Sequence, residues 1–233
     1  MKLELFLLAA PVLLFSMVAH EYAHGYAAFR QGDPTAYQLG RLTWNPMKHI
    51  DPFLTVLLPI MTWFGGGFIF GGAKPVPVVP RNYRNFRQGD IIVSLAGIAT
   101  NVVLAVVATA ALILLGMLGH AVPAAAETCA ILQVMMSFGI FFNIILAYFN
   151  LLPIPPLDGS HVFKYLLPPR LAVHYQQLGR FGLLILLLLF TLGSGLFVRI
   201  MFPVFMLARF AFGTAFPYLI PSQAVPNPFL GLA

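Results

Sequence analysis

Apolar residues run along this chain in long blocks that short polar stretches separate. Five blocks stand out, followed by a sixth that Pro203, Arg209 and Pro217 interrupt; they cover residues 3–29, 53–70, 91–118, 131–152, 181–198 and 200–220. A helix that crosses a membrane needs about 20 mostly apolar residues. The pattern therefore predicts an all-α polytopic membrane protein with about five to six membrane segments. Residues 1–220 are expected to form a single integral-membrane domain, followed by a loose tail over residues 221–233.

The second block, residues 53–70, differs from the others. It contains Pro59 and three consecutive glycines, and its 18 residues are few for a membrane-crossing helix. Lys and Arg lie in the loops on both sides of it, and short loops rich in these residues stay in the cytoplasm. We therefore expect this block to enter the membrane and return on the same side, as a re-entrant segment.

The composition supports the membrane class and narrows the partners. Residues are 60% hydrophobic and only 9% charged, against about 25% charged in soluble domains. The net charge of +6 comes mostly from cations in short loops beside apolar blocks, which is the distribution that sets membrane topology. We expect a lipid bilayer around the protein and no nucleic acid as a partner. The single cysteine, Cys129, excludes an internal disulfide.

The first apolar block carries three ionisable side chains within five residues, His20, Glu21 and His24. They form the pattern H-E-x-x-H. On a helix, its two histidines share one face, about 5–6 Å apart at Cβ, and can bind one metal ion. Glu21 projects about 100° away from His20, so it can act as a base toward water rather than as a ligand. Because ionisable groups are costly in hydrocarbon, the pattern favours a metal centre over a polar contact between helices.

Two histidines leave a catalytic zinc site one ligand short, since such sites have three protein ligands and one open position. Asp51 and Asp158 are the candidates for the third ligand. Asp51 precedes a proline, an arrangement that is common in turns. Asp158 follows the prolines of FNLLPIPPLDGS, which end the preceding helix, and it precedes Gly159, which would permit a tight turn.

Topology favours Asp158. If residues 53–70 are re-entrant, Asp158 reaches the same face of the membrane as His20 and His24; if they cross, about 30 Å of hydrocarbon separates the ligands. We therefore expect His20, His24 and Asp158 to bind one Zn²⁺ per chain, with Glu21 as the catalytic base. An N₂O ligand set with an open position suits zinc better than other metals.

The expected site lies inside the membrane, near its cytoplasmic face. His20 follows Leu3 by 17 residues, which is about 25 Å along a helix. Water must reach a metal at that depth. Asn101, Asn143 and Asn150 are polar residues inside apolar blocks, and either hydrogen bonds between helices or a polar path to the metal would explain them.

Several stretches of the chain resemble the site-2 protease family of intramembrane zinc metalloproteases, in its small prokaryotic branch without a PDZ domain. They are HEYAHG (20–25), GDPTA (32–36), GRLTWNPMKHIDP (40–52), GGAKPVPVVPRNYR (71–84), SLAGIATN (94–101) and FNLLPIPPLDG (149–159). The resemblance implies a three-helix catalytic core over about residues 3–160. It also implies that zinc binds to His20, His24 and Asp158 and that Glu21 activates the water.

The resemblance has two further implications for the site. A short β-like edge strand is expected near FGGAKPVPV, where Gly71, Gly72, Ala73 and Lys74 would hold an extended substrate by main-chain pairing. His49 is expected near the site by analogy, in a supporting role and not as a ligand.

The expected function is zinc-dependent hydrolysis of peptide bonds in or near the transmembrane segments of membrane protein substrates. The alternative is a non-hydrolytic metal-binding membrane protein or a metal transporter. Glu21 argues against it, because a transporter needs no acid beside its ligands. We expect the protein in the cytoplasmic (inner) membrane of a prokaryote, with its active site toward the cytoplasm, and the sequence leaves its oligomeric state open.

Overall fold

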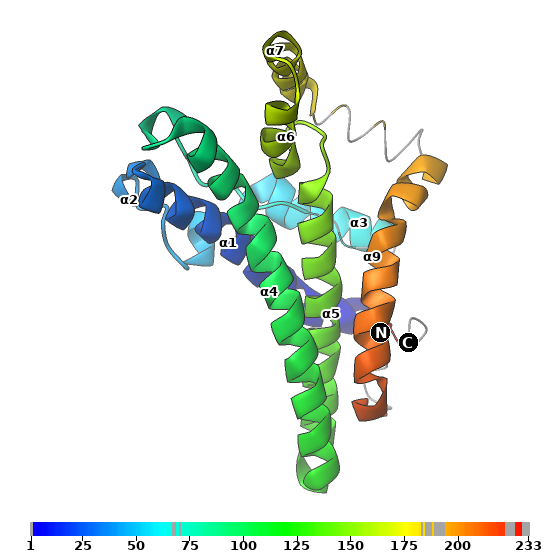
Figure 1. The fold of residues 1–233 in the computed structure, drawn as a ribbon. Coiled ribbons are helices and arrows are strands. Elements are labelled where there is room, and N and C mark those ends of the chain that lie inside the picture. The colour runs from blue at the N-terminus through cyan, green and yellow to red at the C-terminus, as the bar shows by residue number, and fades with distance from the viewer. Residues whose placement is uncertain are drawn as a thin grey trace.

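The computed structural model describes residues 2–66, 69, 71–182, 184, 188, 194–221 and 227–229. Helices dominate these residues (Figure 1): α1 (Lys2–Gln31), α2 (Thr35–Gln38), α3 (Leu58–Gly66), α4 (Phe86–Ala121), α5 (Ala126–Leu151), α6 (Asp158–Phe163), α7 (Pro169–Gln177) and α9 (Ser194–Ala215). Short 3₁₀ turns join several of them, and a π-helical segment, η2 (Pro52–Leu57), leads into α3. The prediction of an all-α polytopic membrane protein is confirmed.

Four of the described helical stretches are long and apolar enough to cross a membrane: Lys2–Gln31, Phe86–Ala121, Pro123–Leu151 and Val198–Tyr218. They correspond to the first, third, fourth and sixth apolar blocks of the sequence. Pro203 lies inside α9 without ending it, so the interrupted sixth block does form a membrane-length helix. Half of the fifth block, residues 181–198, lies outside the described residues.

Helices α4 and α5 form a long antiparallel hairpin, and α1 crosses it near its open end, where α6 and α7 also lie (Figure 1). The main apolar core lies where α1, α4, α5 and α9 meet. Its fully or almost fully buried members include Ala9 and Leu13 of α1, Leu112 of α4, Ile140 of α5 and Phe212 of α9. This packing holds the N-terminal half of α1 against the hairpin and α9.

The second apolar block folds back on itself. Asp51 accepts hydrogen bonds from the main-chain N–H groups of Phe53 and Leu54 and so caps the start of η2. The helical stretch Pro52–Gly65 rises about 21 Å, which is less than the ~30 Å of a hydrocarbon core. The chain then returns to its starting point, because Gly72 N donates to Leu54 O at 2.9 Å and Thr55 Oγ1 donates to Gly72 O at 2.6 Å. The two ends of the segment therefore meet, as a re-entrant segment requires.

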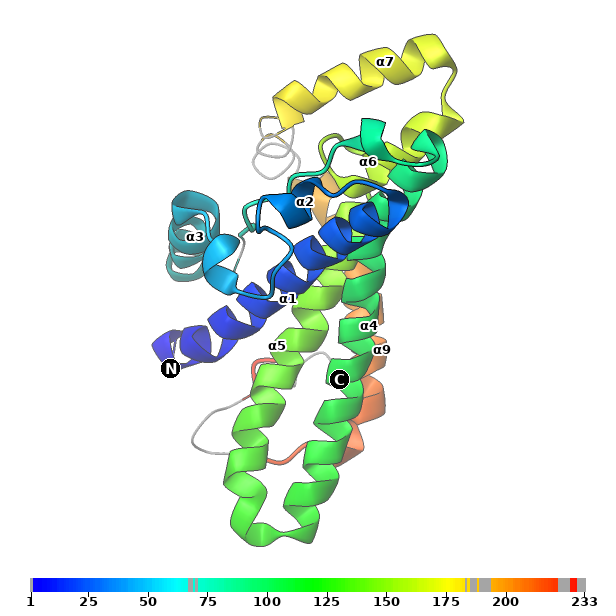
Figure 2. The same ribbon diagram turned by 90° about the vertical axis from the view of Figure 1, so that its left-hand side faces the viewer.

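Helix α3 of this re-entrant segment lies against the N-terminal half of α1 (Figure 2). Trp63 of α3 donates from Nε1 to Lys2 O at 2.9 Å, and its ring centroid lies 6.2 Å from that of Phe6. Residues 71–79, which follow, have no regular secondary structure, and no β-strand occurs in the described part of the chain. The expectation of a β-like edge strand is wrong in that respect. Pro75 and Pro77 lack the main-chain N–H that continuous strand pairing needs.

The C-terminal tail is not loose at residues 227–229. Asn227 Nδ2 donates to Ser137 Oγ at 2.8 Å, and Phe229 is only 8% exposed. Its ring lies 5.2 Å from the centroids of Phe138 and Phe212. An apolar ring close to the chain end thus adds to the core between α5 and α9, a contribution that the polar appearance of the surrounding sequence hides.

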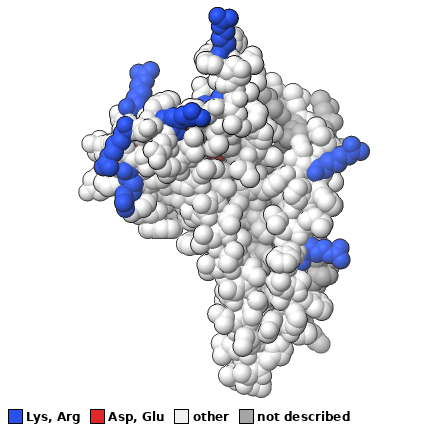
Figure 3. Space-filling view, in the orientation of Figure 1, with Lys and Arg blue, Asp and Glu red and all other residues white. Residues whose placement is uncertain are grey.

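Positive charges gather at one end of the molecule. No Lys or Arg occurs between Arg87, in the first turn of α4, and Lys164, a stretch that includes the rest of the α4–α5 hairpin. In Figure 3 most of the visible Lys and Arg side chains surround the open end of the hairpin, and its far half shows none. The protein is therefore an integral membrane protein with a cationic end and a hairpin tip that carries no Lys or Arg.

Candidate metal centre

Three side chains that are distant in the sequence converge at the open end of the hairpin. His20 Nε2 lies 2.9 Å from His24 Nε2 and 3.1 Å from Asp158 Oδ2, and His24 Nε2 lies 3.2 Å from the same oxygen. Metal–ligand bonds of about 2.0–2.1 Å in a tetrahedron place neighbouring donor atoms about 3.3 Å apart. The three donor atoms therefore have the separation that one zinc ion requires, and no other such cluster occurs among the described residues.

Helix geometry brings the two histidines together, and a chain reversal adds the aspartate. His20 and His24 stand one turn apart on α1, as their spacing predicts. Asp158 is the first residue of α6, directly after the proline-rich stretch that ends α5. Gly159 has no positive φ, so it is not needed for a left-handed turn. It is needed for close approach, because a Cβ there would stand 2.1 Å from Leu151 O.

Helix α4 orients both imidazoles. His20 Nδ1 lies 2.5 Å from Asn101 Oδ1, and His24 Nδ1 lies 2.7 Å from Val93 O. Both partners are acceptors, so each ring donates from Nδ1. In that tautomer Nε2 carries the lone pair that a metal uses. The two rings are therefore held in the orientation and protonation that a metal ligand needs.

Asn101 belongs to a buried network that joins three helices. Its Nδ2 donates to Asn143 Oδ1 of α5 at 2.7 Å, and Asn143 Nδ2 donates to Ser16 Oγ of α1 at 2.9 Å. Asn101 is 0% exposed and Asn143 is 3% exposed. Of the two explanations open from the sequence, hydrogen bonding between helices holds for both. Asn150 instead donates to Leu146 O of its own helix and lines the cavity described below.

Gly97 of α4 leaves the space that the His20 and His24 rings occupy. A Cβ at position 97 would stand 2.6 Å from both His20 Cε1 and His24 Nε2. Only glycine leaves room for the two rings at this point, so the residues present fit a metal ion held by His20, His24 and Asp158.

Asp158 is in the charge state that a ligand requires. Burial by itself raises the pKa of a carboxyl group, but the hydrogen-bonded His20 and His24 side chains hold the pKa of Asp158 below its ordinary value. Any proton on these ligand atoms competes with a metal ion. Metal binding displaces such protons.

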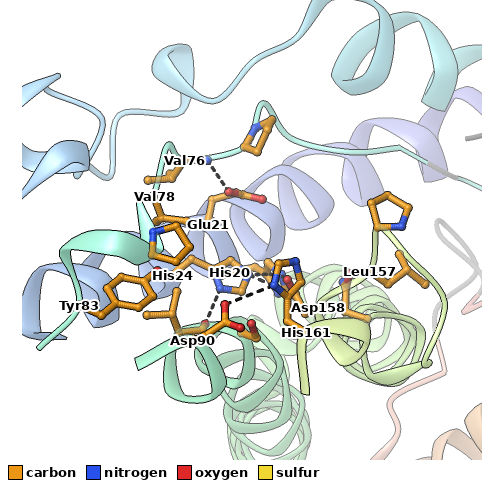
Figure 4. A pocket seen from close by; sticks show the side chains of 16 residues that line it. His20, Glu21, His24, Val76, Val78, Tyr83, Asp90, Leu157, Asp158 and His161 are labelled. Carbon is orange, nitrogen blue, oxygen red and sulfur yellow. Dashed lines mark hydrogen bonds and ion pairs between the residues drawn. The ribbon is translucent and has the colours of Figure 1, made fainter. Parts of the chain in front are cut away.

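A cavity of about 290 Å³ opens beside the three ligands (Figure 4). Its walls come from α1, α4, α6 and residues 75–80, and Glu21 lines it together with both histidines. Glu21 Oε2 accepts a hydrogen bond from Val76 N at 2.7 Å, which directs the carboxylate toward the main chain of residues 75–80. The predicted base and the predicted ligands therefore share one cavity.

Residues 75–80 form the roof of this cavity, and a buried aspartate holds the roof on α1. Asp33, which follows α1, is 0% exposed and accepts hydrogen bonds from Thr35, Val79 N at 2.6 Å and Asn82 Nδ2 at 2.8 Å. Burial raises its pKa, but these hydrogen bonds outweigh that effect and hold the pKa of Asp33 below its ordinary value. The local sequence around Asp33 does not reveal this role.

The remaining candidates lie away from the three ligands. Asp51 caps η2, so it is not the third ligand. His49 is fully buried and contacts Thr43 O through Nε2, outside the cavity wall. Of the proposed substrate edge, Gly72 bonds to Leu54 O and Lys74 N donates to His49 O, so part of the edge is paired within the protein; Gly71 packs on Pro59. Asp90 and His161 also line the cavity, from α4 and α6, and no sequence motif marks them.

An H-E-x-x-H helix, a distant aspartate and a set of membrane-length helices together define a membrane-embedded metallopeptidase fold. The chain matches the model of peptidase family M50 over residues 8–190 and belongs to this family, the site-2 proteases. It is therefore a metalloprotease of the site-2 type.

The curated relatives carry matching names. "Putative zinc metalloprotease YwhC" of Bacillus subtilis is 38% identical over 186 residues, which are 80% of this chain and 81% of that protein. "Putative zinc metalloprotease Rip2" of Mycolicibacterium smegmatis is 34% identical over 184 residues, which are 79% of this chain and 66% of that protein. No solved structure matches the chain.

Proposed function

We propose that this protein is a zinc-dependent intramembrane endopeptidase that hydrolyses peptide bonds in or near the transmembrane segments of membrane protein substrates. The convergence of His20, His24 and Asp158 inside a membrane-length helix bundle carries this proposal. The names of the relatives, which refer to zinc, support the choice of metal. One zinc ion per chain would be held by these three side chains.

Zinc bound there would act as a Lewis acid on the scissile carbonyl and would lower the pKa of the attacking water. Glu21 performs the proton transfers. Its Oε2 is held by Val76 N, so Oε1 is the atom that accepts the proton from water and returns it to the departing amine. The hydrogen bonds from His20 to Asn101 and from His24 to Val93 keep both rings in place throughout.

The substrate would lie extended along the cavity roof. Residues 75–80 are irregular, and main-chain groups beside the base are what an extended peptide pairs with. A transmembrane helix must unwind before its peptide bond enters such a site, because an α-helix occupies its own main-chain hydrogen bonds. Gly71, Gly72, Ala73 and Lys74 lie upstream of this roof, and their role as a substrate edge is part of the proposal.

The active site would face the cytoplasm in the inner membrane of a prokaryote. The cationic end of the molecule is the end that holds the three ligands, and short Lys- and Arg-rich loops stay on the cytoplasmic side (Figure 3). The proposal includes a bilayer around the long helices and a membrane protein as the substrate.

The decisive experiment uses Glu21→Gln in purified full-length protein. This variant should keep zinc, because Glu21 is not a ligand, and should lose cleavage of a transmembrane test substrate by about 10²-fold or more, since general base catalysis is removed. Asp158→Asn should lose zinc and cleavage together. Glu127→Gln, which changes a carboxylate at the other end of α5, serves as the matched control and should cleave normally. Undiminished cleavage by Glu21→Gln would contradict the proposal.

A further inference from the structure

A second buried carboxylate lies near the metal centre without belonging to it. Asp90, in the first turns of α4, is 3% exposed. It contacts Lys164 Nζ at 2.5 Å and Tyr165 OH at 2.9 Å, and His161 Nδ1 lies 3.3 Å away. All three partners follow Asp158 within seven residues of the chain.

The contact with Lys164 is a buried ion pair. Lys164 is 8% exposed, and its Nζ also lies 5.9 Å from the ring centroid of Phe86 and 5.0 Å from that of Tyr165. A buried carboxylate or ammonium that loses its partner is strongly unfavourable. Asp90 therefore ties the stretch that follows Asp158 to α4 in one arrangement.

The stretch that carries Asp158 is short, although Leu157 packs in a small apolar cluster and Gly159 fits against Leu151 O. Helix α6 is only six residues long, its first residue is the ligand, and proline-rich chain precedes it. No side chain caps its start. By contrast, His20 and His24 lie in the middle of a 30-residue helix. The third ligand is thus the one whose position depends most on contacts made elsewhere.

One face of α4 helps to position all three ligands. It contacts His20 and His24 directly, and it contacts the chain that follows Asp158. Asp90, Val93, Gly97 and Asn101 recur at intervals of three or four residues, so they lie along one stripe of the helix. Val93 O holds His24, Asn101 holds His20, and Gly97 makes room for both rings. Asp90 is the member of this stripe that reaches α6.

We propose that Asp90 is a positioning residue for the third zinc ligand: by holding Lys164, Tyr165 and His161, it sets Asp158 at bonding distance from the metal that His20 and His24 bind. This inference rests on the proposed function only in taking zinc as the metal. Asp90 is not a member of the three-ligand cluster, and its side chain is almost fully buried. Its partner His161 also lines the cavity, so loss of Asp90 frees a side chain on the cavity wall as well.

The test measures zinc binding directly. Asp90→Asn in the full-length, membrane-reconstituted protein should raise the Kd for Zn²⁺, determined by competition with a chelator, by about 10- to 100-fold, the usual effect of losing a group that orients a ligand. The visible spectrum of the Co²⁺-loaded variant should change in band position or intensity, because Asp158 no longer holds its place in the coordination sphere.

Two further variants keep the test sharp. Tyr165→Phe removes one hydrogen-bond donor to Asp90 without leaving a charge unpaired, so it serves as the test if Asp90→Asn does not fold. It should raise the Kd for Zn²⁺ by about threefold or more. Asp33→Asn removes an equally buried carboxylate that holds the roof instead of α6, and it should leave the Kd for Zn²⁺ unchanged.

The outcomes separate the two proposals. If the unmodified protein binds no zinc, or if binding does not depend on His20 and Asp158, the proposed function fails. If the unmodified protein binds zinc at those residues and folded Asp90→Asn and Tyr165→Phe bind it equally well with an unchanged cobalt spectrum, the role given to Asp90 is overturned and the proposed function stands.

Discussion

Gly97 of α4 lies so close to His20 of α1 that a Cβ at position 97 would stand 2.6 Å from Cε1 of the imidazole. Two membrane-length helices thus approach each other at the metal centre with no side chain between the glycine and the ring. The same Cβ would lie equally close to His24 Nε2, the atom that would bind the metal. Both histidine rings therefore fit here only because residue 97 has no Cβ.

Gly97→Ala should weaken zinc binding. The added methyl group must push the imidazoles away from their acceptors on α4, and overpacking of this kind costs about 1–3 kcal/mol. We expect the Kd for Zn²⁺ to rise about tenfold or more, with a parallel loss of cleavage. Gly213→Ala in α9, where a Cβ would meet nothing within 4 Å, is the control and should bind zinc normally. Equal Kd values for Zn²⁺ in the two variants would contradict the role of Gly97 in making room for the two rings.

Asn101→Ala should impair zinc binding by a different route. Without Asn101 Oδ1, the Nδ1–H of His20 loses its acceptor, and the ring can rotate or change tautomer. Loss of such a partner typically lowers metal affinity about 10- to 100-fold. Asn143→Ala removes only the next member of the network, so its effect on the Kd for Zn²⁺ should be smaller. A larger effect from Asn143→Ala would mean that helix packing, not ring orientation, explains both.

Asp33→Asn should lower stability in a pH-dependent way. The pKa of Asp33 is depressed in the folded protein, so its contribution is present above the unfolded pKa of about 3.9 and is lost as the pH falls through the folded value. We expect the variant to be less stable than the unmodified protein by about 1–3 kcal/mol at pH 7, with a difference that shrinks below pH ~4. Thermal unfolding at several pH values measures it. A difference that stays constant down to acid pH would contradict the assignment.

The same variant should also raise KM more than it lowers kcat. Asp33 holds Val79 and Asn82 at the roof and touches none of the three ligands. Its loss should therefore disturb substrate placement and leave zinc in position. Steady-state cleavage of a transmembrane test substrate separates the two parameters.

The return of residues 52–72 predicts a specific labelling pattern. In a protein with Cys129 changed to Ser, cysteines introduced at the exposed positions Lys48 and Lys74 should react with a membrane-impermeant reagent from the same side of the membrane. A cysteine at Ala124, at the tip of the α4–α5 hairpin, should react from the opposite side. Reaction of positions 48 and 74 from opposite sides would show that the segment crosses.

Much of the fold could be predicted from hydropathy alone. Long apolar blocks become helices because a bilayer leaves no other way to satisfy main-chain N–H and C=O groups in a single segment. Four of these blocks appear in the structure as membrane-length helices. The short second block, with Pro59 and its glycines, was correctly separated from them, and its ends do meet at Leu54 and Gly72.

Expectations from the sequence are wrong where contacts between distant residues determine the local structure. The resemblance implies an edge strand near FGGAKPVPV, yet the prolines there and the bonds to His49 and Leu54 leave the stretch irregular. Phe229 lies in an apparently loose tail, yet its ring packs against Phe138 and Phe212. Gly159 looked like a turn residue, although its role is to fit beneath the end of α5.

The sequence by itself determined the helices and the chemistry of the centre. Helical spacing puts His20 and His24 on one face of α1 whatever surrounds them. An ionisable residue such as Glu21 is costly inside a membrane helix, so its presence indicates a functional site. The sequence favours Asp158 over Asp51 through topology, and only the tertiary structure decided what holds that carboxylate beside the two histidines. Asp158 meets His20 across 138 residues because α5 returns to the open end of the hairpin and Asp90 anchors the chain beyond it. Such placement depends on packing between helices, which local sequence does not encode.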